Sequence, residues 1–340
     1  MGRSPTDLSV FIGKRLLYLI PVVLGVMMIT FFFTHIAVRN PCAVWAGRNA
    51  TEVQINLCIR NFGLDRPLPE QFGRYMWTLL TGDWGRDPRG GTSILPAIAS
   101  AFPATLELVL TALFLIVVIG VPLGVIAASH NGRWPDHLVR VFYLSGWATP
   151  TYLGAILLAI LVGPVLGLPT SGEFLGSPTF PRPTHMSVLD AILAGDLAAT
   201  GDAVLHLILP ASALAFLNMG IATRMTRASM LEVLPLDFVK TARMKGLSEF
   251  WVLYKHALRN SLISTVTVLG VTAGGLLSGT VVIEEIFQWP GIGRYAFDAV
   301  TNYNFPGAIA VVIVFACGVV VSNMIADILY GILDPRVEWR

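Results

Sequence analysis

FVKTARMKGLSEFWVLYKHALRN, residues 238–260, is the most basic stretch of an otherwise apolar chain. The 340 residues are 54% hydrophobic and only 13% charged, whereas a soluble domain carries roughly 25% charged residues. This composition predicts that most of the chain lies in lipid, and that the quoted stretch is a short polar segment between two membrane spans. The chain has no low-complexity tract and no sustained run of like charge, which argues against a disordered tail or a nucleic-acid-binding arm.

Six apolar runs are long enough to cross a bilayer, which takes about 20 residues. They lie at residues 16–38, 105–128, 141–166, 203–222, 261–283 and 307–331. The first run is too long for the apolar part of a signal peptide, so we expect a retained span. The sequence therefore predicts an all-α membrane protein with six transmembrane helices. We divide it into a cytoplasmic N-terminus and first span (1–38), an external loop that forms a helical cap (39–104), and a five-helix core (105–340) containing a cytoplasmic loop (223–260).

The distribution of lysine and arginine predicts the orientation of these spans. Arg3, Lys14 and Arg15 precede the first span, and residues 223–260 carry seven Lys and Arg, whereas the connection between the third and fourth spans carries only Arg182. Positively charged residues stay on the cytoplasmic side. Both termini and the quoted stretch are therefore expected in the cytoplasm. Residues 39–104 break the charge pattern, but a loop of about 60 residues translocates largely regardless of its charge.

The predicted external loop contains two of the three cysteines, Cys42 and Cys58. An external compartment is oxidising, so this pair is a candidate disulfide, with two unpaired thiols as the alternative. Cys317 falls inside the sixth span and is expected to be a small core residue. Apolar residues between Leu68 and Leu80 recur at helical spacing. They predict an amphipathic helix that lies on the bilayer surface or over the mouth of a passage.

Motifs of enzyme chemistry are not found in this sequence. It contains no phosphate-binding G-x-x-x-x-G-K-[ST] loop, no H-E-x-x-H pair and no Cys/His cluster with zinc spacing, so we expect no catalytic residue and no metal site. An ion-coupled transporter usually needs ionisable groups at membrane depth, but the acids here lie near span ends and form no relay. Energy for transport is therefore expected from another protein.

Small residues occur on more than one face of the fifth span. Such residues allow another helix to approach closely, or they leave a smooth wall along a passage for a bulky solute. The candidates for the passage and its external gate are Gly274, Gly275, Ser278, Glu284 and Glu285. Plain helix packing is the alternative interpretation, and it is the one we expect for Gly120 and Gly124 of the second span.

The quoted stretch reads as two helical pieces separated by Gly246. Ser248 is a suitable N-cap for the second piece. The first has a small, apolar centre flanked by basic residues; the candidate contact residues are Lys240, Thr241, Ala242, Arg243, Gly246 and Leu247. A helix of this kind on the cytoplasmic face can press into a groove of another protein. An ordinary basic loop explains the charges, but it does not explain the glycine-centred pair of helices.

The segment TARMKGLSEFWVLYKHALRNSL resembles the cytoplasmic loop of ABC-importer permeases, whose general form is E-A-A-x-x-x-G-x9-I-x-L-P. Ala242, Gly246 and Leu258 match that form. The departures at Lys240, Thr241, His256 and Arg259 are similar to the variant of the dipeptide, oligopeptide and nickel permeases. The resemblance continues through FPATLELVLTALFLIVVIGVPLGVIAA, RASMLEVL, EEIFQWPGIGR and LYGILDPR.

This resemblance implies a transport subunit of a prokaryotic cytoplasmic membrane that is not itself an enzyme. It would pair with a second, similar permease and with two cytoplasmic ATPases that hold ATP and magnesium, while an external solute-binding protein delivers the cargo. Residues 238–246 would form the coupling helix that docks on an ATPase. The expected cargo is dipeptides or short oligopeptides, with nickel chelates, opines or sugars as alternatives. A self-sufficient secondary transporter or channel is the alternative from a different class.

Overall fold

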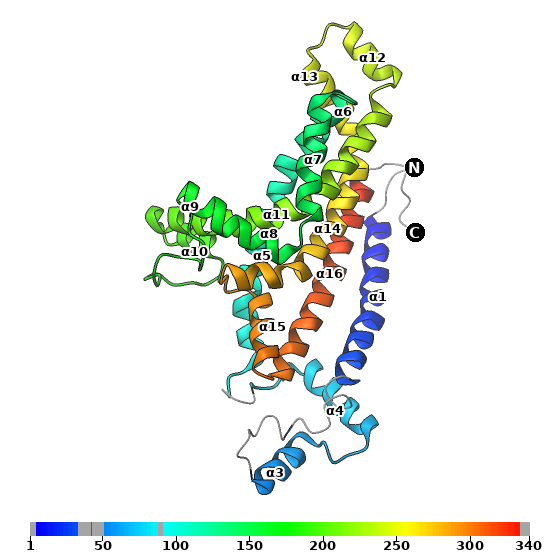
Figure 1. The fold of residues 1–340 in the computed structure, drawn as a ribbon. Helices are drawn as coiled ribbons and strands as arrows, with labels where there is room; N and C mark the ends of the chain where they lie inside the picture. Colours follow the sequence, from blue (N-terminus) through cyan, green and yellow to red (C-terminus); the bar gives the residue numbers. More distant parts are fainter. Residues whose placement is uncertain (1–4, 33–41, 43–50, 88–90, 334–340) are drawn as a thin grey trace.

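The computed structural model describes residues 5–32, 42, 51–87 and 91–333. Within these residues the secondary structure is helical, apart from one β-bridge between Arg86 and Ser93 (Figure 1). The α-helices are α1 (Pro5–Phe32), α3 (Glu52–Phe62), α4 (Leu68–Leu80), α5 (Ile94–Leu115), α6 (Val121–Ser129), α7 (Trp134–Ala148), α8 (Thr151–Leu157), α9 (Gly163–Leu166), α10 (Ser187–Leu193), α11 (Leu197–Val233), α12 (Asp237–Met244), α13 (Glu249–Trp251), α14 (Leu258–Ile286), α15 (Ile292–Thr301) and α16 (Phe305–Leu333). Three π-helical segments join them without a break: η2 (Ile116–Gly120), η3 (Leu158–Val162) and η4 (Val252–Ala257).

Four helical segments among the described residues are long and apolar enough to cross a membrane: Ile94–Ser129, Leu197–Val233, Glu249–Ile286 and Phe305–Ile328. A fifth span is obtained if α7 and the segment from α8 to α9 are counted together. The first predicted span corresponds to α1, whose apolar part Ile20–Phe32 is shorter; residues 33–38 of that prediction lie outside the described residues. Each of the six predicted runs thus lies on a helix or a broken helix.

The apolar run predicted over residues 141–166 forms a broken helix rather than one continuous helix. The chain bends by 112° between α7 and α8, at Thr149 and Pro150. Proline has no N–H to donate, and it disfavours helical geometry in the residue before it. The helix therefore stops at Ala148, and α8 starts in a new direction.

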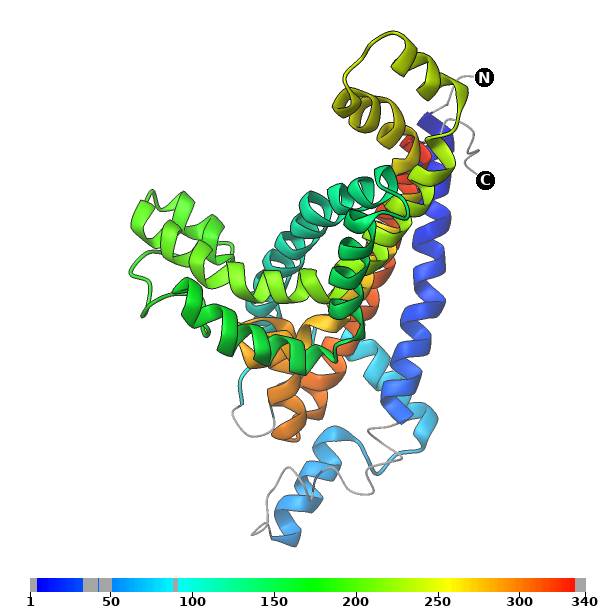
Figure 2. The same cartoon turned by 45° about the horizontal axis from the view of Figure 1, so that its top comes forward.

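The longest helix, α11, forms the centre of the fold. It has 37 residues, and Figure 2 shows it running from beside α10 to the connection that leads into α12. The main hydrophobic cluster is built on it, with Leu209, Leu214 and Leu217 packing among side chains of α5 and α14. Burial of this apolar surface fixes the central helices relative to one another.

Glycines allow α6 and α7 to approach α11 closely. A Cβ atom added at Gly124 would lie 2.6 Å from the Cβ of Thr226, and one added at Gly146 would lie 2.4 Å from the carbonyl oxygen of Phe216. At Gly120 the nearest atom would be Thr223 Oγ1, at 3.1 Å. The prediction that Gly120 and Gly124 serve helix packing is confirmed.

The two ends of the helix bundle carry different structures. α12 and α13 project from one end, and α3 and α4 lie at the opposite end (Figure 1). This arrangement agrees with the predicted placement of residues 223–260 and of the 39–104 loop on opposite sides of a membrane.

Candidate functional site

The projecting loop between α11 and α14 is the first candidate site. It is made of α12, α13 and η4, and Figure 2 shows it standing clear of the other helices at its end of the bundle. α12 ends at Met244, and in the turn that follows the N–H of Gly246 donates to the carbonyl of Arg243 at 2.9 Å. Gly246 has φ +77°, and a Cβ atom there would meet nothing within 4 Å. The glycine is therefore required for its left-handed backbone rather than for close contact within this chain.

The inner face of α12 consists of Val239 and Ala242, which are the buried side chains of this helix. They pack in a cluster with residues of α6, α11 and η4: Val125, Ala128, Met230, Val252, Leu253 and Ala257. Ala242 is only 5% exposed. Its own chain therefore leaves little of Ala242 for a partner to touch, and the predicted contact of Ala242 with another protein stays a prediction.

The outer face of this loop is formed by apolar side chains that the rest of the chain leaves uncovered. Its members are Phe238, Met244, Leu247, Phe250 and Trp251, each at least two-fifths exposed. Met244 is the most exposed of them, at 79%. Phe250 stacks on Tyr254 with ring centroids 4.8 Å apart, so the aromatic part of the face is held in one arrangement. A surface of this kind is typical of a contact with another protein.

Polar residues of the loop are held by ion pairs within it. Lys240 Nζ lies 2.9 Å from Asp237 Oδ1, and Arg243 Nη2 lies 2.7 Å from Glu249 Oε1. Hydrogen bonds to Glu249 raise the pKa of the Arg243 guanidinium, which therefore stays charged. The Arg243–Glu249 bridge spans Gly246 and fixes the angle between α12 and α13. Lys240 and Thr241 are both exposed, at the rim of the outer face.

A buried ion pair supports the base of this loop. Arg227 of α11 donates through Nε to Asp136 Oδ1 at 2.8 Å and through Nη2 to Asp136 Oδ2 at 2.9 Å. Its Nη2 also donates to Asn131 Oδ1 at 2.8 Å. Asp136, on α7, is fully buried. In the sequence, Arg227 is one of the seven positively charged residues of the 223–260 segment. No spacing rule relates it to Asp136, which is 91 positions away.

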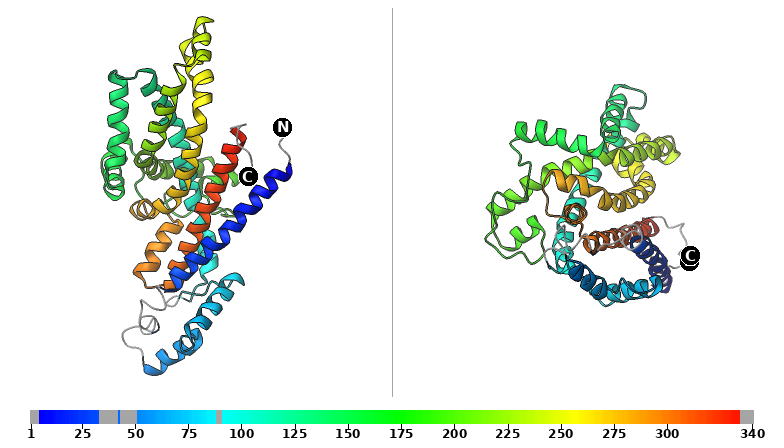
Figure 3. Two further views of the ribbon diagram at one scale, coloured as in Figure 1. Left: turned by 90° about the vertical axis from the view of Figure 1, so that its right-hand side faces the viewer. Right: turned by 60° about the horizontal axis from the view of Figure 1, so that its bottom comes forward.

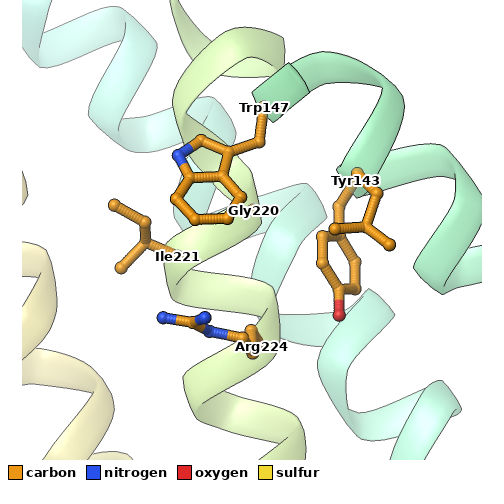
Figure 4. A pocket seen from close by; sticks show the side chains of 6 residues that line it. Tyr143, Trp147, Gly220, Ile221 and Arg224 are labelled. Atoms are coloured by element: carbon orange, nitrogen blue, oxygen red, sulfur yellow. The ribbon is translucent and has the colours of Figure 1, made fainter.

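A shallow hollow lies between α7 and α11, the two helices that carry this ion pair. Figure 4 shows Tyr143 and Trp147 of α7 on one side and Ile221 and Arg224 of α11 on the other. The Arg224 guanidinium carbon lies 5.6 Å from the centre of the Trp147 ring, a cation–π contact. Gly220 keeps the hollow open, because a Cβ there would lie 3.3 Å from Tyr143.

The residues predicted for the passage do not share one environment. Gly274 is buried, and an added Cβ would lie 3.5 Å from Ser322 Cβ on α16, so its position is that of a helix-packing residue. Gly275 and Ser278 are exposed on α14, and a Cβ at Gly275 would meet nothing within 4 Å. Only this exposed small face is available to line a passage or to contact another protein.

Glu284 is fully buried, which differs from the expected acid near a gate. Its Oε1 accepts a hydrogen bond from Thr105 Oγ1 at 2.7 Å, and its Oε2 accepts one from the N–H of Arg294 at 2.9 Å. Thr105 Oγ1 in turn accepts the N–H of Ile292 at 2.8 Å. The carboxylate thus caps the first turn of α15, a position where negative charge is favourable. It also ties this turn to α5. Glu285 is half-buried beside it, and its buried Oε2 accepts no hydrogen bond from the described residues.

The cysteine prediction is only partly within the described residues. Cys42 is disulfide-bonded and Cys317 is a free thiol. The side chain of Cys58 lies outside the described residues, so its pairing with Cys42 stays a prediction.

Comparison with known proteins covers almost the whole chain. The family described as binding-protein-dependent transport system inner membrane component matches residues 120–339, and the family of its N-terminal part matches residues 8–114. The chain is 39% identical to the "Probable D,D-dipeptide transport system permease protein DdpB" of Escherichia coli (strain K12), over 94% of each chain. It is 37% identical to the dipeptide transport system permease protein DppB of Alkalihalophilus pseudofirmus, over 96% of this chain and 98% of that protein.

Two further matches are more distant. The glutathione transport system permease protein GsiC of Salmonella paratyphi A is 34% identical, over 97% of this chain and 99% of its own length. The solved MetNI methionine ABC transporter, in inward-facing conformations, matches with a TM-score of 0.48 and 15% identity, over 77% of this chain and 98% of the matched chain.

Proposed function

Because this chain belongs to the family of binding-protein-dependent transport system inner membrane components, we propose that it forms half of the membrane passage of an ATP-driven importer for dipeptides or short oligopeptides. The proposed cargo class is supported by the relatives that match this chain over nearly their whole length. The names of these relatives refer to D,D-dipeptides, dipeptides, di- and tripeptides, and glutathione, which are all short peptides.

The partners in this proposal are a second, similar permease, two cytoplasmic ATPases that bind ATP and magnesium, and an external binding protein. The outer face of the α12–α13 loop supports the ATPase contact, because it is apolar and exposed. In the proposed orientation this loop and both termini face the cytoplasm, and α3 and α4 face outward. Such an orientation follows the distribution of Lys and Arg.

The exposed small face of α14, with Gly275 and Ser278, is the proposed wall of the passage. Glu284 is assigned a supporting role instead, since its carboxylate is used to hold α15. The external gate is then α15 itself and the end of α14 to which it is tied, rather than a free acid in the solute's path.

The test is reconstitution of the assembled importer in liposomes with its binding protein. We expect ATP-dependent accumulation of labelled dipeptide, and a short peptide retained by the binding protein and identified by mass spectrometry. Retention of a nickel chelate, an opine or a sugar would replace the cargo class but keep the importer. Uptake by this chain without ATPases would overturn the importer and favour a secondary transporter or channel.

A further inference from the structure

We propose that α4 is an in-plane membrane anchor, with Trp77 and Leu80 inserted into the lipid beside the end of α1. The sequence alone allowed this helix either to lie on a bilayer or to cover the mouth of a passage. Contacts along its length separate three sectors of its surface, and one of these is apolar and uncovered.

α4 is held by contacts with the last described turn of the first membrane helix. Tyr75 Oη lies 3.4 Å from Thr30 Oγ1, and the ring centres of Phe31 and Phe72 are 5.2 Å apart. Thr30 and Phe31 belong to the last described turn of α1, at the end of the apolar segment Ile20–Phe32. Figures 1 and 3 show α4 beside this end of α1, at the opposite end of the molecule from α12. α4 is therefore held against the external half of the predicted first span, residues 16–38.

The first sector of α4 packs on the bundle. Tyr75, Met76 and Leu79 join the cluster built on Met27 of α1 and on side chains of α16. This contact accounts for about half of the apolar arc, which extends from Tyr75 to Trp77 over about 200° at about 100° per residue.

The other half of the apolar arc is uncovered. Leu80 is 72% exposed and Trp77 is 69% exposed, and both lie on the side next to Met76. The remaining third of the helix is polar and exposed, with Glu70, Arg74 and Thr78. Three sectors in this order are what a helix needs when it touches protein on one side, lipid on the next and water on the third.

Lipid is favoured as the occupant for two reasons. Exposed apolar side chains on the same part of α1, Met28 and Ile29, are 60% and 59% exposed, so the uncovered arc continues the surface of a membrane span. Tryptophan also prefers the boundary between hydrocarbon and headgroups, where its ring is buried and its N–H remains hydrated.

The experiment uses the assembled importer in vesicles of phosphatidylethanolamine and phosphatidylglycerol. In a Cys317→Ser background, Trp77→Cys and Leu80→Cys are each labelled with a nitroxide, and Thr78→Cys on the polar arc is the matched control. Collision rates with oxygen, which concentrates in lipid, and with a water-soluble nickel chelate are measured by electron paramagnetic resonance. Peptide uptake by each variant shows that the complex is intact.

At positions 77 and 80 we expect the ratio of oxygen to nickel collisions to exceed that at position 78 several-fold. Equal ratios at the three positions would overturn the proposal and place this arc in water. Exclusion of both reagents from positions 77 and 80 would also overturn it, and would assign the arc to a protein partner such as the binding protein. These readings depend only on the surroundings of α4, so they are independent of which solute is transported. As a second measurement, quenching of tryptophan fluorescence by brominated lipid should fall in Trp77→Phe, and an unchanged quenching would contradict the proposal.

Discussion

Replacing Ala242 with aspartate tests how α12 is held in the loop between α11 and α14. Val239 and Ala242 are the buried side chains of α12. Burial of a valine contributes roughly 1.5–3 kcal/mol and each further methyl group about 0.8 kcal/mol, so the two together hold α12 by roughly 2–4 kcal/mol. An unpaired carboxyl group in the same cluster costs several kcal/mol, whether it stays charged or takes up a proton. The cost of the buried carboxyl group therefore exceeds the free energy that holds α12 in place, and α12 should detach from α6 and η4.

The assay is limited trypsin digestion of the purified importer, since α12 carries exposed Lys240 and Arg243. Cleavage of a transiently open segment follows the population of its open form, and each 1.4 kcal/mol changes that population tenfold. Ala242→Asp should accelerate cleavage within α12 by roughly tenfold or more and release the ATPases. Uptake should be lost while the membrane helices remain assembled.

Met244→Asp is the matched control, because Met244 is 79% exposed and packs on nothing within the cluster. This variant should leave trypsin cleavage unchanged and still weaken ATPase binding, since its new charge falls on the outer face. The reasoning is refuted if Ala242→Asp resists trypsin like the wild type and retains its ATPases. It is also refuted if Met244→Asp binds the ATPases normally, because the outer face would then not be the docking surface.

Three other substitutions test further parts of the site. Gly246→Ala should weaken ATPase co-purification because an L-residue at φ +77° costs roughly 1–2 kcal/mol, and Gly246→Asn should be milder; equal binding by both variants and wild type would contradict this. Ser278→Trp should abolish peptide uptake by an assembled complex, whereas Gly274→Trp should prevent assembly because Gly274 faces α16; normal uptake by Ser278→Trp would assign that face to packing or lipid. Glu284→Ala should lower the midpoint of thermal unfolding, since each buried donor left unpaired costs about 1–3 kcal/mol, with exposed Glu232→Gln as the control; an unchanged midpoint would contradict the capping role.

The sequence predicted the helices well because a membrane span can be recognised from its length and apolar content alone. Hydropathy did not reveal the break within residues 141–166, because it stays high across a bend of 112°. Pro150 was the available signal, since a proline inside a helical pattern predicts a break at the residue before it. Hydropathy measures what lipid tolerates, and it carries no information on direction.

The coupling loop could be placed from the sequence, but its faces could not. α12 carries two buried apolar side chains, Val239 and Ala242, and two exposed ones, Phe238 and Met244. Which side is inner depends on where α6 ends, more than a hundred residues earlier in the chain. Short-range periodicity identifies an amphipathic helix, while only tertiary contacts decide which apolar side another protein can reach.

The buried carboxylates were beyond the reach of sequence reasoning for a related cause. Glu107 and Glu284 both lie near the ends of apolar runs, where an acid usually meets water. Glu107 instead accepts hydrogen bonds from the N–H groups of Ser187 and Val188, at 2.8 and 2.9 Å. Ser187 follows it by 80 residues, and the Thr105 that binds Glu284 precedes it by 179. Pairings at such separations leave no spacing signature.

These two carboxylates show how α5 organises one side of the molecule. Glu107 holds the start of α10, and Thr105, two residues earlier on the same helix, holds both Glu284 and the N–H of Ile292 at the start of α15. Buried hydrogen bonds to charged groups are costly to break, so α10 and α15 are fixed to α5. α12 is held differently, by two buried apolar side chains, Val239 and Ala242, and by ion pairs that remain exposed to solvent. Of the segments that project from the bundle, the coupling loop therefore costs less to detach than α15, and a force applied to it by a partner is resisted mainly by the cluster around Val239 and Ala242.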